Sequence, residues 1–350
     1  MRDPAAPTLL PEWAPQSGVL LVWPHEASDW ASRLEAAETE YAALARAIAW
    51  HEPVLVACHD RPHETRVRRR LAEAGVPDER LRFTVAPSDD TWVRDYGPLA
   101  VGSTGALELV DFAFNAWGGK YPHARDDALT GRLHASGALG AAPLRRDPLV
   151  VEGGALETDG RGTLLTTAGC LDAPSRNGGL GRDGVEARLR DVLGLARVIW
   201  LEVDPLPGDD TDGHVDTLVR FCDAATLAHV TCDARGDPLH EALHDLERQL
   251  RALRTADGRP YRLVPLPLPA PQHAVDGRRL AATHANFLVV NGAVLCPLYG
   301  DPADGTALER LGEAFPDHEV IGVPARTLIE ENGSLHCATM QLPAGLALAG

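Results

Sequence analysis

Residues 284–300 read HANFLVVNGAVLCPLYG, and this stretch predicts a β-hairpin with two apolar arms. Asn291 and Gly292 stand between the arms, and Asn-Gly is the dipeptide most typical of a two-residue hairpin turn. Residues 304–315 have the apolar spacing of an amphipathic helix, and residues 318–325 read as a short strand. The stretch therefore predicts one unit of two strands, a helix and a further strand.

The same order of elements returns along the chain, so that five ββαβ units are predicted. The other four span residues 18–60, 99–154, 153–203 and 214–269. The predicted helices are residues 30–49, 184–193, 237–253 and 304–315. The first unit is complete only if the last predicted strand, residues 334–343, pairs with residues 18–24. Five such units predict a closed α/β ring forming one domain over residues 1–350, with an ordinary mixed-sheet α/β protein as the alternative.

Composition restricts the class of protein. The chain has 350 residues, 45% of them hydrophobic, and a formal net charge of −17, which disfavours nucleic acid and membrane surfaces and suits a small cationic partner. No apolar run reaches the ~20 residues of a membrane helix and no signal peptide is evident, so we expect a cytoplasmic protein. The six cysteines are scattered without zinc or disulfide spacing, which predicts no metal. The oligomeric state stays open, and a homo-oligomer is compatible with the sequence.

His214 and Asp216 are the clearest candidates for proton transfer. They stand one residue apart, so at the start of a strand both side chains would face the same side. A histidine beside a carboxylate is typical of a general acid or base, and a hydrogen bond within a polar turn is the alternative. A metal site of His214, Asp216 and Asp212 is disfavoured, because it lacks the further histidine or cysteine of a catalytic zinc site.

Cys337 is a candidate nucleophile near the end of the chain. It follows Asn332 and Gly333, which predict a tight turn before the last strand. A cysteine with a distant histidine and carboxylates fits nucleophilic catalysis, whereas a lone buried cysteine is the alternative. His336 should point to the opposite face of a strand from Cys337, so it receives no role as a base.

Two further acids occupy defined turns. Asp95 lies in TWVRDYGP, residues 91–98, directly before a tyrosine and a Gly-Pro pair. Glu152 precedes Gly153 and Gly154, which permit a close approach of another chain or a ligand. For both acids a capping or solvated carboxylate is the alternative.

Six motifs together resemble the agmatine deiminase family, part of the guanidine-modifying superfamily that includes bacterial peptidyl-arginine deiminases. They are, in order, TWVRDYGP (91–98), FNAWGGKYP (114–122), EGG (152–154), DDTDGHVD (209–216), HANFLVVNG (284–292) and GSLHCATMQLP (333–343). The resemblance implies a five-bladed α/β propeller with pseudo-fivefold symmetry and an enzyme without a cofactor. It also implies that Cys337 is the nucleophile, that His214 is the general acid and base, and that Asp95 and Asp216 bind the guanidinium.

The resemblance extends to the rest of the pocket, with two departures. Further substrate-binding positions are implied at Trp92, Glu152 and Asp210. The family usually has glycine where Asn332 stands and often glutamate where Asp210 stands, so specificity could differ.

The implied reaction is hydrolysis of agmatine to N-carbamoylputrescine and ammonia through a covalent adduct. Alternatives within the superfamily are a deiminase of free arginine or peptidyl-arginine, in which Arg94, Arg125 or Arg176 would bind a carboxylate, and an amidinotransferase. From other classes, a non-catalytic polyamine-binding protein would need no thiol, and a thiol protease would need no cluster of acids.

Overall fold

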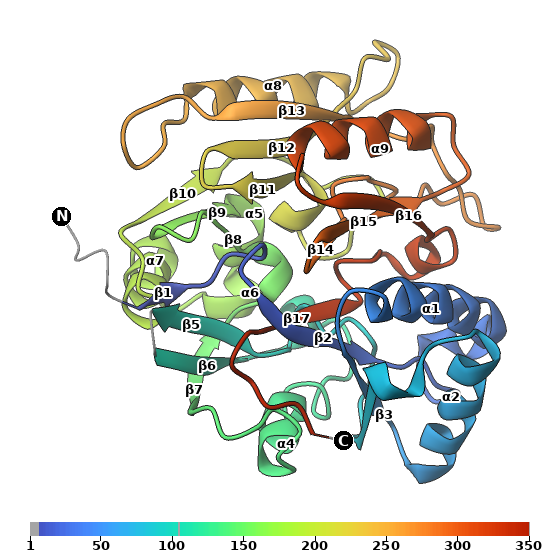
Figure 1. Ribbon diagram of the computed structural model, residues 1–350. Coiled ribbons are helices and arrows are strands. Elements are labelled where there is room, and N and C mark those ends of the chain that lie inside the picture. The colour runs from blue at the N-terminus through green and yellow to red at the C-terminus, as the bar shows by residue number, and fades with distance from the viewer. Residues whose placement is uncertain (1–6, 104–105, 350) are drawn as a thin grey trace.

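The computed structural model describes residues 7–103 and 106–349, and within them the strands form five sheets (Figure 1). Three sheets come from consecutive stretches of chain: β8 (Glu157–Thr158), β9 (Thr163–Thr167), β10 (Arg197–Leu201); β11 (Val219–Asp223), β12 (Thr226–Thr231), β13 (Arg262–Pro267); β14 (Leu288–Val290), β15 (Ala293–Leu298), β16 (Glu319–Pro324). A fourth adds the distant β1 (Thr8–Leu9) to β5 (Leu99–Ser103), β6 (Ala106–Ala113) and β7 (Leu144–Val150). The fifth contains β17 (Thr339–Pro343), β2 (Gln16–Val22), β3 (Val54–Cys58) and β4 (Leu81–Val85).

Each sheet has the same core pattern, an antiparallel pair followed by a parallel pair. A parallel connection needs a crossover, and a helix supplies it in each unit. The helices are α1 (Leu34–Ala49), α2 (Arg61–Glu73), α3 (Ala116–Gly119), α4 (Leu129–Ala135), α5 (Ala168–Leu171), α6 (Pro174–Asn177), α7 (Gly181–Val192), α8 (His240–Ala252) and α9 (Ala303–Ala314). Short 3₁₀ turns are η1 (Asp29–Ser32), η2 (Asp78–Arg80), η3 (Gly153–Ala155), η4 (Val215–Thr217) and η5 (Leu328–Glu331). In Figure 1 the longer helices lie toward the outside and the strands toward the middle.

The predicted hairpin is confirmed. Strands β14 and β15 pair antiparallel, with Val290 opposite Ala293, and Gly292 adopts a left-handed φ of 74°. The strand begins at Leu288 rather than at 284; ahead of it the backbone N–H of Ala285 donates to the Thr283 hydroxyl instead of to a neighbouring strand. The four predicted helices are confirmed within a few residues, except that the first is broken by η1.

The ends of the chain meet in one sheet, as the repeat required. Strand β17 pairs antiparallel with β2, with Thr339 opposite Leu21. The strand predicted from residue 334 begins only at Thr339, because residues 334–338 form a turn. The strand predicted at 148–154 lies earlier, at β7, and Glu152 already belongs to the next turn.

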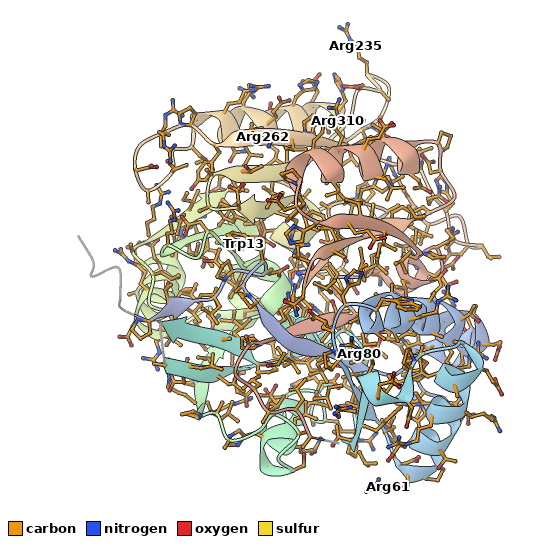
Figure 2. All side chains as sticks on the ribbon, in the orientation of Figure 1. Trp13, Arg61, Arg80, Arg235, Arg262 and Arg310 are labelled. Atoms are coloured by element: carbon orange, nitrogen blue, oxygen red, sulfur yellow. The ribbon has the colours of Figure 1, made fainter. Side chains whose placement is uncertain are left out.

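Residues 10–15 carry the chain from β1 to β2. Strand β1 pairs with β5, and Trp13 beyond it lies near the middle of the view in Figure 2. Arg61 and Arg235 extend instead from opposite ends of the molecule.

Within the described residues, no helix combines the length and the apolar character that a membrane span requires.

Candidate active site

His214 and Asp216 belong to a turn, so the strand argument for their orientation was wrong. Asp216 lies in η4, and β11 begins only at Val219. Both side chains nevertheless face Gly154, where an added Cβ would lie 2.6 Å from Nδ1 of His214 and 3.0 Å from Oδ2 of Asp216. The turn therefore directs the side chains of His214 and Asp216 to the same side, as the predicted strand was expected to do.

Cys337 lies in the turn before β17 and is held by Asn286. The amide Nδ2 of Asn286 donates to the Cys337 sulfur at 3.2 Å, and its Oδ1 accepts from the Cys337 backbone at 3.3 Å. The thiol donates to Oδ2 of Asp216 at 3.6 Å. Burial, followed by the charges of Asp216 and Asp95, raises the pKa of Cys337 well above its usual value. The sulfur is therefore a thiol before a cation arrives.

Asp95 is fixed from two sides. It accepts hydrogen bonds from the backbone of Gly154 and from Nε1 of Trp117, each at 2.9 Å. A left-handed backbone turns Trp117 toward Asp95: φ is 53° at Ala116 and 54° at Trp117. Positive φ angles are uncommon for residues other than glycine. Burial raises the pKa of Asp95 to about 6, against the opposing effect of His214, whose Nδ1 lies 3.7 Å away.

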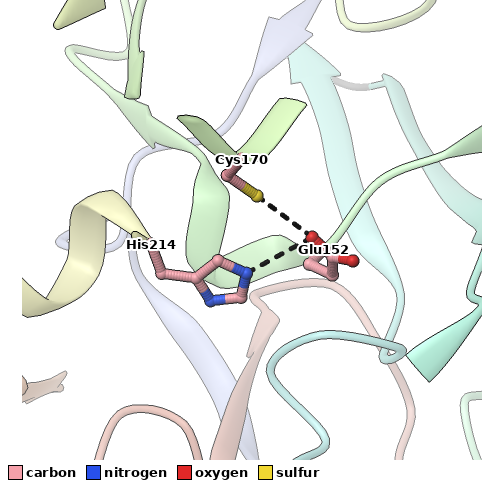
Figure 3. Close-up of side chains that lie close together, drawn as sticks. All are labelled: Glu152, Cys170 and His214. Carbon is pink, nitrogen blue, oxygen red and sulfur yellow. Dashed lines mark hydrogen bonds and ion pairs between the residues drawn. The ribbon is translucent and has the colours of Figure 1, made fainter. Parts of the chain in front are cut away.

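Glu152 holds the other side of the His214 ring (Figure 3). Its Oε2 lies 3.3 Å from Nε2 of His214 and accepts from the thiol of Cys170 at 3.2 Å. Nε of the buried Arg176 donates to both carboxylate oxygens at 2.8 Å. Burial disfavours a charged His214, yet Asp95, Cys170 and Glu152 together raise its pKa well above the usual value. His214 is therefore an imidazolium at neutral pH.

This group could in principle hold a metal ion, since one ligand atom each of Glu152, Cys170 and His214 lies within 4.8 Å of the others. The guanidinium of Arg176 on Glu152 opposes a divalent cation there. The other candidate ligand from the sequence, Asp212, pairs with Arg176 at 2.7 Å and with Lys120 at 3.0 Å. The residues therefore suit a cationic organic group better than a metal.

Two buried polar atoms at the centre of the site lack a hydrogen-bond partner among the described residues, Nδ1 of His214 and Oδ1 of Asp216. Both residues are fully buried. A buried unpaired carboxylate oxygen is costly, so its presence indicates a place where a ligand donates a hydrogen bond.

A pocket of about 420 Å³, open to solvent, leads to Cys337. Its lining residues are Asp29, Asp90, Trp92, Asp95, Trp117, Tyr121, Asp210, Thr211, Glu331, Asn332, Gly333 and Cys337. Five of these carry carboxylates and none is lysine or arginine. A side chain at Gly333 would collide with Trp92, at 2.4 Å from its ring, so glycine lets Trp92 form the wall. The described pocket is therefore built for positive charge.

The two departures from the family pattern touch each other at the mouth of the pocket. Nδ2 of Asn332 donates to Oδ2 of Asp210 at 3.2 Å, and the same oxygen accepts from the Tyr121 hydroxyl at 2.9 Å. Asn332 has a left-handed φ of 71°, a conformation that favours glycine and that asparagine tolerates.

The three arginines considered for a substrate carboxylate are engaged elsewhere. Arg94 pairs with Glu12 at 3.2 Å, Arg125 lies 3.7 Å from Asp89, and Arg176 binds Glu152. The pocket lining includes none of them.

Sequence analysis missed Asn286 and Glu12, and it placed His336 wrongly. Nδ1 of His336 lies 2.7 Å from Oδ2 of Asp216, and its Nε2 lies 2.6 Å from Oε1 of Glu12. His336 and Cys337 therefore reach the same carboxylate, because a turn replaces the expected strand. Asn286 lies within the motif HANFLVVNG, which was the available signal, and Glu12 lies in the stretch PEWAPQSGVLLVWP (11–24), where the family resemblance begins but which was given no role in the site.

The described fold is mixed α/β and matches solved structures of guanidine-modifying enzymes. Residues 8–343 match the family described as Porphyromonas-type peptidyl-arginine deiminase, and the chain belongs to this family.

Named relatives cover nearly the whole chain. It is 36% identical to the agmatine deiminase of Stutzerimonas stutzeri strain A1501, over 95% of this chain and 94% of that protein. A cysteine-to-serine variant of C. jejuni agmatine deiminase with substrate bound is 33% identical, with a TM-score of 0.89 over 97% of each chain. A Porphyromonas gingivalis protein provisionally named an arginine deiminase is 44% identical, with a TM-score of 0.90 over 97% of this chain and 99% of that one.

Proposed function

We propose that this protein is an agmatine deiminase, which hydrolyses agmatine to N-carbamoylputrescine and ammonia. The observation that carries the proposal is the pocket, where acids extend from the mouth to Cys337 and no basic side chain lines the described walls. Agmatine carries a guanidinium at one end and an ammonium at the other, so both ends would meet carboxylates. The α-carboxylate of arginine would enter the same pocket as an unpaired like charge.

The guanidinium is held by Asp95 and Asp216 in this proposal. A guanidinium is planar and offers paired N–H donors, and Oδ1 of Asp216 is a buried acceptor without a partner. Clamping it between the two carboxylates would fix its carbon beside the sulfur. The positive charge would also favour the thiolate of Cys337 over the thiol.

The covalent route then proceeds in balanced steps. As the guanidinium binds, the Cys337 thiol releases its proton to solvent and the thiolate forms a bond to the guanidinium carbon; His214, as imidazolium, gives a proton to the departing nitrogen, whose C–N bond breaks so that ammonia leaves. The carbon stays bound to sulfur as an amidino adduct. Neutral His214 takes a proton from water, whose oxygen attacks the adduct; the C–S bond breaks, and the protonated ureido product gives its extra proton to the sulfur as it leaves.

The remaining predicted residues support this chemistry. Glu152 would orient His214 through Nε2, because its oxygens already bind Arg176, Cys170 and His214. Asp210 and Trp92 would bind the aminobutyl end of the substrate at the mouth and wall of the pocket.

Deimination of peptidyl-arginine is the second candidate, because the family description carries that name. The test is a side-by-side assay of ureido product with agmatine, free arginine and a peptide with an internal arginine. Agmatine should have the highest kcat/KM; equal or better turnover of either arginine form would overturn the substrate assignment.

The nucleophile is tested with Cys337→Ala, which should lower kcat at least ~10²-fold while the protein stays folded. Cys222→Ala is the matched control, because Cys222 is buried in a different part of the core. Mass spectrometry of the trapped wild type should find a substrate-derived mass on Cys337. Retained activity in Cys337→Ala would exclude the covalent route.

The five sheets, with their shared strand pattern, also support a five-bladed α/β propeller with pseudo-fivefold symmetry and a single catalytic domain over residues 1–350. We place the protein in the cytoplasm, in keeping with its six free cysteines.

A further inference from the structure

His336 lies between two acids, and the reaction scheme above gives it no task. Its Nδ1 lies 2.7 Å from Oδ2 of Asp216, and its Nε2 lies 2.6 Å from Oε1 of Glu12. The ring is fully buried. Turning the ring over would place carbon atoms against both acids, so each nitrogen keeps its own carboxylate.

Both contacts need a proton on the ring. An ionised carboxylate can only accept, and an imidazole donates from both nitrogens only as an imidazolium. Burial alone would raise the pKa of Glu12, but two guanidinium groups and the ring of His336 hold it well below its usual range. Burial acts on Asp216 in the same direction, but the hydrogen bond and the charge of His336 lower its pKa. Both acids are therefore ionised, and a bare ring nitrogen would set its lone pair against a carboxylate oxygen.

Two arginines oppose a charged ring without displacing its partners. Burial and the charges of Arg220 and Arg94 lower the pKa of His336. The carboxylates of Glu12 and Asp216 raise it, and both guanidinium groups pair with Glu12. The two short contacts decide for the imidazolium, because loss of either ring proton would turn one of them into a repulsion between lone pairs.

We propose that His336 is a positioning residue, which as an imidazolium holds Asp216 in its ionised form with Oδ1 directed to the substrate guanidinium. The ring binds Oδ2, whereas Oδ1 is the buried acceptor that has no partner among the described residues. Rotation of the carboxylate would break the short contact to Nδ1. Asp216 therefore offers the guanidinium one oxygen in a fixed direction. The inference rests on the proposed function, which assigns the guanidinium to Asp216.

Glu12 fixes the far side of the ring. Its Oε1 accepts from Nη1 of Arg94 at 3.2 Å, and its Oε2 accepts from Nε2 of Gln341 at 3.0 Å and from Arg220. Gln341 belongs to β17 and Arg220 to β11. His336 thus connects Asp216 to a carboxylate that two sheets hold in place.

A metal ion is the alternative occupant of this cluster, since one ligand atom each of Glu12, Glu157 and His336 lies within 4.8 Å of the others. The guanidinium of Arg220 pairs with both acids and opposes a divalent cation there. An imidazolium also has no lone pair for a metal. The contacts therefore favour a proton over a metal ion.

Loss of the ring charge has a definite sign. The charged and titratable groups that face Asp216 are His336, His214, Arg220, Arg94, Cys337 and Asp95, and those that face His336 are Glu12, Asp216, Arg220 and Arg94. Without the imidazolium the pKa of Asp216 rises, so its ionised form is lost at a higher pH as the solution is acidified. The acid limb of kcat/KM should therefore move upward. The limb of kcat should move less, because the bound guanidinium then supplies positive charge.

The first test is the pH profile of agmatine turnover by His336→Asn, with thermal unfolding to check the fold. His63→Asn is the matched control, because His63 is also buried and both of its ring nitrogens are hydrogen-bonded, but to the backbones of His59 and Pro24. For His336→Asn the loss of kcat/KM relative to the wild type should be at least ~10-fold larger at pH 6 than at pH 9, whereas His63→Asn should show the same ratio at both. A loss of equal size at every pH in His336→Asn would mean a structural role alone and overturns the proposal.

The second test is NMR of the full-length protein without substrate, with ¹⁵N in the histidine rings. Protonated and bare ring nitrogens resonate at clearly different ¹⁵N frequencies. The signals of His336 are identified by their absence in His336→Asn and by their displacement in Glu12→Gln. Both nitrogens should carry protons from pH 6 to pH 9. A bare nitrogen on His336 at pH 7 overturns the proposal, even if His336→Asn fails to fold. This readout needs no turnover, so a protein inactive on agmatine would overturn the proposed function while the protons on His336 are still decided.

Discussion

A methyl group added by Gly154→Ala would enter the space shared by three side chains of the site. Its Cβ would lie 2.6 Å from Nδ1 of His214, 2.9 Å from Oδ1 of Asp95 and 3.0 Å from Oδ2 of Asp216. Gly154 lacks a positive φ, so alanine fits the backbone and the effect comes from these contacts alone. Ordinary contacts of this kind need about 3.4 Å or more, so His214 must retreat by most of an ångström.

Gly154→Ala should lower the rate of catalysis much more than it lowers the stability of the fold. Overpacking at one buried position costs about 1–3 kcal/mol, so the variant should remain folded with Tm lowered by some degrees. A displacement near 1 Å of reacting groups costs about 10²-fold, so kcat on agmatine should fall by that factor.

The assay is steady-state ammonia release together with calorimetry of the same samples. Gly305→Ala is the control, because Gly305 lies in α9 and an added Cβ meets no atom within 4 Å. Its kcat should be unchanged. If Gly154→Ala kept more than about a tenth of the wild-type kcat, the close arrangement of His214, Asp95 and Asp216 would not be what the reaction depends on.

Three further outcomes are expected. Burial raises the pKa of Asp90 to about 7, and a cationic substrate selects the ionised form, so KM for agmatine should fall as pH rises through 7; in Asp90→Asn this pH dependence should disappear. Asn332→Gly should keep kcat within about twofold and change KM by a few-fold, since it loses one hydrogen bond to Asp210 worth about 1 kcal/mol; a large loss of kcat would contradict a role at the mouth. Glu152→Gln should lower kcat more than it raises KM if the acid acts through His214, whereas the reverse would indicate direct contact with substrate.

The parts of the fold that local sequence determines were predictable. The hairpin at Asn291 and Gly292 and the crossover helices follow from turn chemistry and apolar periodicity. Strand ends were less accurate where polar side chains bind backbone N–H groups, as Thr283 does at Ala285 and Asn286 does at His336 and Cys337.

The sequence predicted which residues form the candidate site, but not the backbone conformation that brings them together. His214, Asp216, Asp95 and Cys337 do come together, but the periodicity of a strand was the wrong reason, because turns position them. Glu12 could not be found from sequence, since its importance depends on contacts with residues more than 200 positions away.

The pairing of β17 with β2 has a consequence for how the protein is made. Met340 pairs with Leu20 although the two residues stand near opposite ends of the sequence, and Cys337 lies two residues before this strand. During synthesis the strand β2 must therefore wait, with one edge uncovered, until all the other sheets have left the ribosome. Closing so long a loop is slow, so the nucleophile should be assembled last and a chain that stalls before β17 should be inert yet prone to aggregate.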